Sequence, residues 1–145
     1  MNFVEFIKEY YGVTPKLSDR YGEWLGYSIS TVDKDRGKVV THLTIRDDHL
    51  SPSGAVHGGV ISGFLDFTCG CSVFSTLNKG QLCSTVELNV KYFKPLRSGD
   101  EIFAEAEVLS RGNSLCSVLA KMYKQENKEQ LIALATGTFN IYQPR

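Results

Sequence analysis

A long apolar stretch, residues 54–77, constrains the fold most, because its only ionisable side chains other than thiols are His57 and Asp66. Its length and composition predict a buried helix with Asp66 in the middle. A carboxylate inside an apolar helix is destabilising unless it is paired, hydrogen-bonded or used in chemistry. Gly58 and Gly59 open this helix, and the free N–H groups of a helix start can bind negative charge. Oxyanion donors and a lone carboxylate are the parts of a hydrolytic site.

Each of these residues also has a simple structural explanation, which stays open at this point. Asp66 can be satisfied by a Ser, Thr or backbone partner, the glycine pair can serve close packing, and His57 can bond locally at the helix start. Each glycine inside the helix destabilises it by roughly 1 kcal/mol relative to alanine, so the glycines indicate a geometric requirement.

With 145 residues, the chain is expected to form a single domain over residues 1–145. The formal net charge is zero, so no nucleic-acid partner is expected, and an anionic ligand needs a local basic patch. Residues 54–77 are too rich in Gly, Ser and Cys for a membrane span, and they contain Asp66. Because charged residues interrupt the N-terminal apolar run, no signal peptide is expected, and a cytoplasmic location is.

The cysteines lie in apolar or strand-like segments, at Cys69, Cys71, Cys83 and Cys116. Cys69 and Cys71 are two residues apart on the predicted helix, so their side chains point in different directions. No cysteine spacing resembles a zinc site, and neither a metal nor another cofactor is expected. Free, buried thiols in a reducing compartment are the expected state.

Hydrophobic periodicity divides the rest of the chain into a helix over residues 2–11, a loop over 13–24 and an irregular segment over 47–55. The predicted strands cover residues 25–33, 37–46, 83–94, 101–110, 114–124 and 131–142. A long central helix wrapped by a mostly antiparallel sheet of about six strands, with a short N-terminal helix, is an α+β fold.

The central helix has two faces of different side-chain size. The bulky stripe, which is expected to pack on the sheet, consists of Val60, Phe64, Phe67, Cys71 and Phe74. The small-residue face can admit another backbone or a ligand, and it consists of Gly59, Ser62, Gly63, Asp66, Cys69, Gly70 and Val73.

The spacing of Gly58 and Asp66 restricts how they can cooperate. Eight residues of helix put them on the order of 12 Å apart, because a helix rises about 1.5 Å per residue. One small reacting centre cannot lie about 3 Å from both. Either the two residues serve different purposes, or the glycine end of one helix meets Asp66 of another chain. The second option predicts a dimer with two helices side by side and two equivalent sites.

The segment 57–61, His-Gly-Gly-Val-Ile, followed by Asp66 nine residues after the histidine, resembles the hotdog-fold acyl-CoA thioesterases. Within them it is similar to the PaaI-like (phenylacetyl-CoA thioesterase-like) group. The resemblance extends to residues 85–95, a strand that ends in proline, and to the Gly-Asp pair at 99–100. It covers roughly residues 25–142 and implies the hotdog fold.

The resemblance also implies roles for the matching residues around the helix. The Gly58 N–H would polarise the thioester carbonyl, with Gly59 beside it in the substrate site. His57 would orient the loop and the helix start. Asp66 of the partner subunit would activate water or attack the thioester directly, and the sequence does not choose between general base and nucleophile.

Hydroxyl residues complete the implied site. Thr85 aligns with a residue that assists the attacking water in similar enzymes, and its neighbour Ser84 is the alternative if the register is shifted. Ser51 stands six residues before the histidine, where many relatives have an asparagine. Serine is shorter but can still hydrogen-bond.

An acyl-CoA substrate needs cations for its phosphates. The candidate phosphate-binding residues are Lys91, Lys94 and Arg97 after the third predicted strand and Arg111 in a turn. The alternative is a solvated basic edge that discourages strand pairing. Tyr21 and Trp24 are candidates for the acyl pocket.

These observations predict an acyl-CoA thioesterase that forms a homodimer or a dimer of dimers and uses no cofactor beyond the CoA of its substrate. An acyl-CoA-binding hotdog module without turnover is the alternative, which Ser51 favours and Asp66 disfavours. A hotdog dehydratase or hydratase would place a catalytic histidine and an acid in a different pattern. The acyl group is not specified by the sequence.

Overall fold

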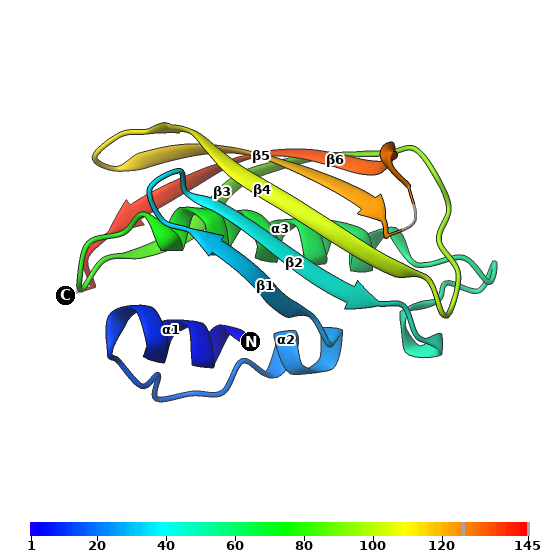
Figure 1. Cartoon of the computed structure of the whole chain (residues 1–145), viewed down its shortest axis with the longest axis horizontal. Helices are drawn as coiled ribbons and strands as arrows, with labels where there is room; N and C mark the ends of the chain where they lie inside the picture. Colours follow the sequence, from blue (N-terminus) through cyan, green and yellow to red (C-terminus); the bar gives the residue numbers. More distant parts are fainter. Residues whose placement is uncertain (126, 145) are drawn as a thin grey trace.

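The protein is described here by a computed structural model that covers residues 1–125 and 127–144. The elements in chain order are α1 (Phe3–Tyr11), α2 (Arg20–Leu25), β1 (Ser28–Asp33), β2 (Lys38–Thr44), η1 (Asp47–His49), α3 (Gly58–Ser75), β3 (Leu82–Tyr92), β4 (Glu101–Arg111), β5 (Leu115–Lys124) and β6 (Asn127–Tyr142). All six strands form one antiparallel sheet in the order β1-β2-β4-β5-β6-β3. The sheet wraps around α3, with α1 and α2 beside β1 (Figure 1), which confirms the predicted α+β architecture.

The central helix α3 begins and ends at side-chain caps. The His57 side chain accepts a hydrogen bond from the Gly59 N–H at the start, and Thr76 caps the end. In the middle, the Thr68 hydroxyl pairs with Thr41 of β2 at 2.7 Å, and both side chains are fully buried. This pair links the middle of the helix to the sheet within the buried core.

The bulky stripe of α3 was predicted to pack on the sheet, and only part of it does. Phe67 and Phe74 instead contact aromatic rings of the N-terminal segment: Phe3 lies edge-on to both, with ring centroids 5.8 and 5.4 Å away. Tyr27 stacks on Phe67 from the same side. The N-terminal helix therefore covers a face that the sheet leaves open.

The small-residue face was also predicted too broadly. Cys69 and Val73 are fully buried in the core on the sheet side, whereas Ser62, Gly63 and Asp66 remain partly accessible. A helix inside a curved sheet is enclosed over more of its circumference than the stripe alone suggested.

Residues 13–24 were predicted as a loop but contain most of the short helix α2. The Asp19 side chain caps it by accepting from the Gly22 N–H, and Gly26 ends it in the left-handed region with φ 81°. Six residues are too few for a periodic signal. The next strand consequently begins at Ser28 rather than near residue 25, while β6 begins at Asn127, before the predicted 131.

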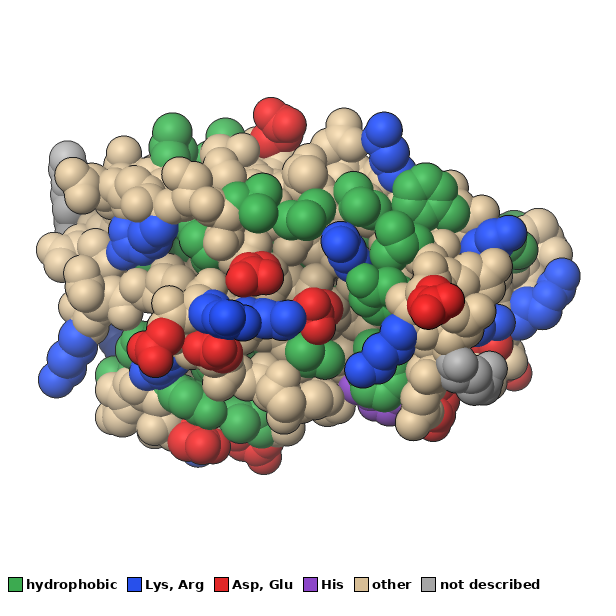
Figure 2. Space-filling model, turned by 45° about the horizontal axis from the view of Figure 1, so that its top comes forward, with side chains coloured by type: hydrophobic (Ala, Val, Ile, Leu, Met, Phe, Trp, Pro, Cys, Tyr) green, Lys and Arg blue, Asp and Glu red, His purple; other side chains and the backbone are tan. Residues whose placement is uncertain are grey.

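By length and composition alone, α3 could cross a membrane, but 61% of it is buried inside the protein. Its apolar surface is explained by the sheet and α1 around it. On the face that Figure 2 shows, acidic and basic side chains lie close together rather than in patches of one sign. Lys38 and Glu105, on the neighbouring strands β2 and β4, form an ion pair at 2.9 Å.

Candidate active site at Asp66

The start of α3 presents the groups that the sequence predicted for an oxyanion. His57 is exposed, and its Nδ1 accepts from the Gly59 N–H at 2.9 Å. Gly58 is the first helical residue, so its N–H belongs to the first turn, which has no acceptors within the helix. The Tyr92 hydroxyl donates to the Gly58 carbonyl at 3.3 Å. Tyr92 was not predicted from the sequence, because only the fold brings the end of β3 to the helix start.

Asp66 lies in the middle of α3 and is partly buried. The Thr85 hydroxyl donates to the Asp66 Oδ1 at 2.8 Å, across 19 residues of sequence. The structural interpretation of Asp66 called for such a Ser, Thr or backbone partner, whereas the resemblance implied that Thr85 assists the attacking water. The neighbouring Ser84 lines a cavity together with Asp66 and Thr85. It makes no hydrogen bond to Asp66 in the part of the chain that the structure describes.

A third side chain approaches this carboxylate from α2. The Tyr21 hydroxyl lies so close to Gly63, one helical turn before Asp66, that a Cβ at that glycine would be 2.0 Å from the phenol oxygen. Burial and, secondarily, the charge of Asp66 raise the pKa of Tyr21, so the phenol stays protonated and can act as a hydrogen-bond donor.

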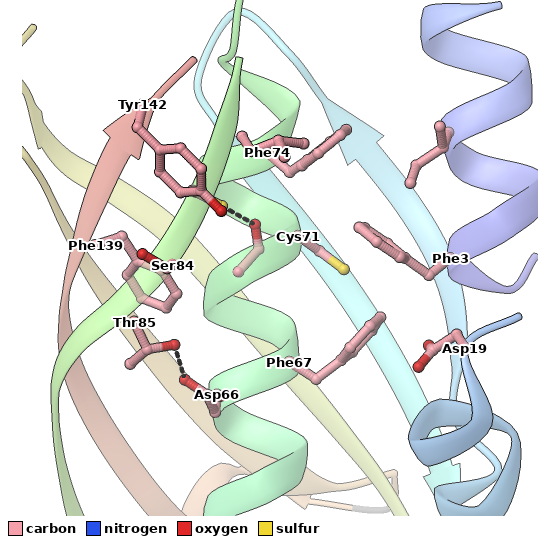
Figure 3. A pocket seen from close by; sticks show the side chains of 14 residues that line it. Phe3, Asp19, Asp66, Phe67, Cys71, Phe74, Ser84, Thr85, Phe139 and Tyr142 are labelled. Atoms are coloured by element: carbon pink, nitrogen blue, oxygen red, sulfur yellow. Dashed lines mark hydrogen bonds between the residues drawn. The ribbon is translucent and has the colours of Figure 1, made fainter. Parts of the chain in front are cut away.

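Asp66 and Thr85 lie at one end of a cavity of about 330 Å³ (Figure 3). Its walls come from α1, α3, the first residues of β3 and the end of β6, and Phe3 of α1 packs edge-on against Phe67 and Phe74 of α3 beside it. Tyr21 and Trp24, the predicted acyl-pocket residues, line a different cavity of about 380 Å³ next to His49 and His57. The structure thus has a mainly apolar cavity at the carboxylate and a second cavity, with polar and aromatic lining, at the helix start.

Within one chain, Gly58 and Asp66 do not meet at one point. Gly58 begins α3 and Asp66 comes eight residues later on the same continuous helix, a separation on the order of 12 Å. Gly59, Ser62, Gly63 and Asp66 line an open depression on the helix. This accessible face is where a second helix would have to approach.

Ser51 lies in the loop before α3 and its hydroxyl is engaged within that loop. The Ser51 Oγ lies 2.7 Å from the Ser53 Oγ and donates to the Ala55 carbonyl at 3.0 Å. It lines neither the cavity at Asp66 nor the one at His57. In this structure Ser51 closes the loop rather than facing the carboxylate.

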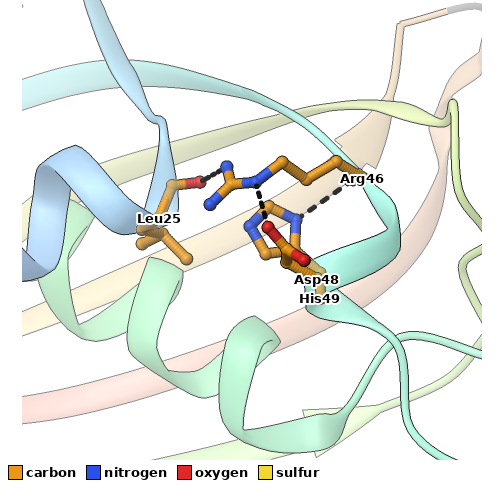
Figure 4. A network of polar contacts seen from close by, with 4 residues as sticks. All are labelled: Leu25, Arg46, Asp48 and His49. Atoms are coloured by element: carbon orange, nitrogen blue, oxygen red, sulfur yellow. Dashed lines mark hydrogen bonds and ion pairs between the residues drawn. The ribbon is translucent and has the colours of Figure 1, made fainter.

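A polar network holds the segment that leads into the Ser51 loop (Figure 4). His49 is fully buried, and its Nδ1 accepts from the Arg46 backbone N–H at 3.2 Å. The Arg46 guanidinium donates to the Leu25 carbonyl at 3.0 Å and lies 3.6 Å from the Asp48 carboxylate. Burial and then the Arg46 charge lower the pKa of His49, so the imidazole is neutral. The network joins α2 to the approach to α3.

The candidate phosphate-binding residues fall into two places. Lys91, Lys94 and Arg97 are exposed at the end of β3 and just after it, on the side of the helix start, since the Leu96 carbonyl accepts from the Val56 N–H. Arg111 lies at the other end of α3, where its guanidinium donates to the Thr76 hydroxyl at 3.2 Å. The fold therefore does not bring Arg111 together with the lysines.

All the cysteines are free, as the sequence predicted. Burial raises the pKa of Cys69 to about 12 and that of Cys83 to about 11, so neither is a ready nucleophile. Among residues 1–125 and 127–144, no group of His, Cys, Asp and Glu side chains could hold a metal ion.

The chain is similar in sequence to known thioesterases. Residues 53–130 match the thioesterase superfamily. Human acyl-coenzyme A thioesterase 13 is 28% identical over 87 residues, which cover 60% of this chain and 61% of the human protein. The chain thus spans less than two thirds of that relative.

Solved structures share the fold over most of the chain. A phenylacetic acid degradation-related thioesterase candidate from Ralstonia eutropha JMP134 superposes with a TM-score of 0.80 at 29% identity, over 93% of this chain and 98% of the other. A hypothetical thioesterase from Streptococcus pneumoniae TIGR4, solved with coenzyme A, has a TM-score of 0.72 at 24% identity, over 82% and 90% of the two chains. The second likeness shows the fold alone.

Proposed function

Because this chain belongs to the thioesterase superfamily and has the hotdog fold of its PaaI-like members, we propose that it hydrolyses acyl-CoA thioesters. The observation that carries the proposal is the hydrogen bond from Thr85 to Asp66 at the end of an apolar cavity. A superfamily match gives the reaction class, and a carboxylate held by a hydroxyl beside an apolar space gives a place for it.

In the proposed reaction, water attacks the thioester carbonyl carbon and the carbon–sulfur bond breaks. Asp66 takes the proton from the water and returns it to the departing thiolate, so the products are a carboxylic acid and free CoA. Thr85 fixes one carboxylate oxygen and leaves the other for the water. Direct attack by Asp66, with hydrolysis of the resulting anhydride, gives the same products and remains the alternative.

The carbonyl oxygen needs a donor, and we propose that Gly58 of a partner subunit supplies it. Two features support this arrangement: the separation of Gly58 and Asp66 along one helix, and the accessible small-residue face around Gly63. Among residues 1–125 and 127–144, β3 is an edge strand that pairs only with β6, so its other edge is available to a second chain. A homodimer, alone or doubled into a tetramer, would then contain two equivalent sites.

The exposed cations near the helix start are the proposed contacts for the CoA phosphates. Lys91, Lys94 and Arg97 lie on the side of Gly58, so they would serve the subunit that provides the oxyanion donor. Arg111 is held by Thr76 at the opposite end of α3, and we propose for it a structural role. With free, unreactive thiols, the chain is suited to a reducing compartment such as the cytoplasm.

A second candidate function is acyl-CoA binding without turnover. Ser51 favours it, because its hydroxyl is used inside its own loop, where similar enzymes place an asparagine near the reacting groups. Asp66 disfavours it, since a carboxylate beside a thioester has no purpose in a binder.

The first experiment measures thiol release from phenylacetyl-, benzoyl-, acetyl-, hexanoyl- and palmitoyl-CoA by the wild type and by Asp66→Asn. We expect turnover by the wild type and a loss on the order of a hundredfold or more in the variant. Retained turnover in a folded Asp66→Asn protein would contradict the role of Asp66. Acyl-CoA binding without hydrolysis across the panel would support the second candidate.

The shared site has its own test. Gly58→Pro removes the N–H at the first helical position, where proline is tolerated, and the preceding His57 already has φ −63° and ψ 133°, which suits a following proline. Asp66→Asn and Gly58→Pro should each be inactive. Refolding them together should restore about a quarter of wild-type activity, because half the dimers are mixed and each has one intact site. No recovery in a mixture shown to contain mixed dimers would place both groups in one chain's site.

A further inference from the structure

Tyr21 of α2 brings a hydroxyl close to the reacting groups, and the proposed reaction does not use it. The residue lies outside 53–130, the part of the chain that matches the thioesterase superfamily. Its ring lines the cavity at the helix start together with His57. Its oxygen lies against Gly63, which lines the open depression that also contains Asp66. The Tyr21 hydroxyl is therefore placed on α3 between the first residue of that helix and the carboxylate.

Gly63 makes room for this hydroxyl. A Cβ at position 63 would be 2.0 Å from the Tyr21 oxygen and 3.2 Å from the nearest carbon of the ring. The oxygen, more than the ring, therefore excludes a side chain at this position. Glycine is among the poorest helix formers, so the close approach of the hydroxyl accounts for a glycine inside α3 that helix stability does not favour.

The Tyr21 hydroxyl is a donor without an acceptor in the part of the chain that the structure describes. Tyr11, Tyr27 and Tyr92, by contrast, each donate to an oxygen of the protein. Burial and then the charge of Asp66 raise the pKa of Tyr21, and no hydrogen bond contributes to that change. The phenol thus keeps its proton at neutral pH and can donate it to a hydrogen bond.

Tyr21 and Asp66 are neighbours that do not bond to each other directly. Residues three apart on a helix have Cβ atoms roughly 5–6 Å apart, so a hydroxyl against Gly63 is one turn from the carboxylate. Thr85 donates directly to the Asp66 Oδ1 (Figure 3), whereas no bond joins Tyr21 to Asp66 among the described residues. Two polar groups at such a separation are suited to hold one water molecule between them.

We propose that Tyr21 is a further catalytic residue, whose hydroxyl donates a hydrogen bond to the attacking water while that water donates to the Asp66 oxygen that Thr85 leaves free. The inference rests on the proposed function and adds a reacting group to it. With one lone pair engaged by Tyr21 and one proton by Asp66, the other lone pair of the water is directed at the thioester carbonyl carbon.

The phenol keeps its proton throughout the proposed reaction. As the carbon–oxygen bond forms, one proton of the water passes to Asp66. The carbon–sulfur bond then breaks, and the departing thiolate takes that proton from Asp66. Tyr21 therefore orients the water and is neither consumed nor charged in the cycle.

The first test is Tyr21→Phe, which removes the hydroxyl and keeps the ring. Tyr21 is 52% exposed, so the fold should tolerate the change. With the acyl-CoA that the wild type hydrolyses fastest, we expect kcat to fall about tenfold to a hundredfold, because the water loses one of its two orienting groups. Tyr123→Phe is the matched control, since Tyr123 lies on β5 and lines neither cavity. Its kcat should equal that of the wild type.

Binding is measured separately, by calorimetry, with a thioether analogue of the same acyl-CoA that carries an alkyl group in place of the acyl group. The dissociation constant should be the same for Tyr21→Phe and the wild type, because the hydroxyl contacts the water rather than the acyl-CoA. A hydroxyl that served substrate binding would instead raise KM and the dissociation constant and leave kcat unchanged.

Gly63→Ala provides a second variant, which keeps Tyr21 but displaces its hydroxyl. It should lower kcat by a factor similar to that of Tyr21→Phe. In a Tyr21→Phe background it should lower kcat little further, because both changes remove the same donor. Losses that multiply in the double variant would overturn the inference, since position 63 would then act on turnover without the hydroxyl.

An unchanged kcat in Tyr21→Phe, or a defect confined to KM and analogue binding, also overturns the inference. The proposed function survives either result as long as Asp66→Asn is inactive. If the wild type releases no thiol from any acyl-CoA, the proposed function fails and this inference fails with it.

Discussion

The Thr85 hydroxyl lies 2.8 Å from the Asp66 carboxylate, and it joins the edge strand β3 to the middle of the central helix. Neither residue on its own would indicate a functional site. Threonine is common in strands, and a helical aspartate has many available partners. The contact holds one carboxylate oxygen, and in the proposed reaction the other oxygen takes the proton from water.

Replacing Thr85 by Val should lower turnover while leaving the fold intact, because the side chain is exposed and the two residues have similar shape. We expect kcat to fall roughly tenfold to a hundredfold, since the carboxylate loses its orientation. Steady-state thiol release measures the change. Thr85→Ser, which keeps the hydroxyl, should recover most of the rate, and equal losses in both variants would argue against an orienting role.

Two glycines of α3 should respond differently to alanine. Gly70→Ala should raise the free energy of unfolding by about 1 kcal/mol, the usual helix gain, because its Cβ meets only the Phe139 ring at 3.7 Å. Gly63→Ala should gain less, because its Cβ would be 2.0 Å from the Tyr21 hydroxyl and must displace it. Urea unfolding measures both. In a Tyr21→Ala background the Gly63→Ala gain should return, and strict additivity would show that the two residues are not in contact.

His49 should make stability depend on pH in a defined direction. Its pKa is lowered in the folded protein by burial and by Arg46, whereas the unfolded chain has the ordinary value of about 6.5. Below about pH 6.5 the unfolded state therefore binds a proton at His49 more readily than the folded state does. The free energy of unfolding consequently decreases as the pH falls. The contribution is fully present above that pH.

The measurement compares urea unfolding of the wild type and of His49→Gln at neutral pH and at about pH 5.5. The wild type should lose more stability between the two than the variant, which carries no titrating group at this position. An equal loss would mean that other residues cause the acid sensitivity.

The cysteines should react slowly in the folded protein. Burial raises the pKa of Cys69 to about 12 and of Cys83 to about 11, and Cys71 shifts in the same direction, so the thiolate is scarce at about pH 8. Thiol titration should show slow modification of the native protein and rapid reaction of all four cysteines in denaturant. A fast native phase would identify an exposed, activated thiol and contradict this burial.

The sequence by itself determined the central helix and the strand pattern, and it supplied the candidate reacting groups. The apolar stretch 54–77 predicted a buried helix, which forms over Gly58–Ser75, and the alternation in segments such as 101–110 predicted half-buried strands. The helical spacing of Gly58 and Asp66 was also readable, because a helix has a fixed rise. These are local properties, which neighbouring residues specify.

The tertiary structure decided everything that depends on residues far apart in the chain. Tyr92 reaches Gly58 across 34 residues and Phe3 reaches Phe67 only because α1 folds back over the open side of α3. The Ser51 hydroxyl donates to the Ala55 carbonyl within its own loop. The short helix α2 formed where a loop was predicted. The six-residue helix α2 leaves no periodic signal, because packing rather than local propensity stabilises it. The helical spacing of residues 2–11 predicted α1 itself but not its position against α3, since that position depends on contacts with residues far away in the chain.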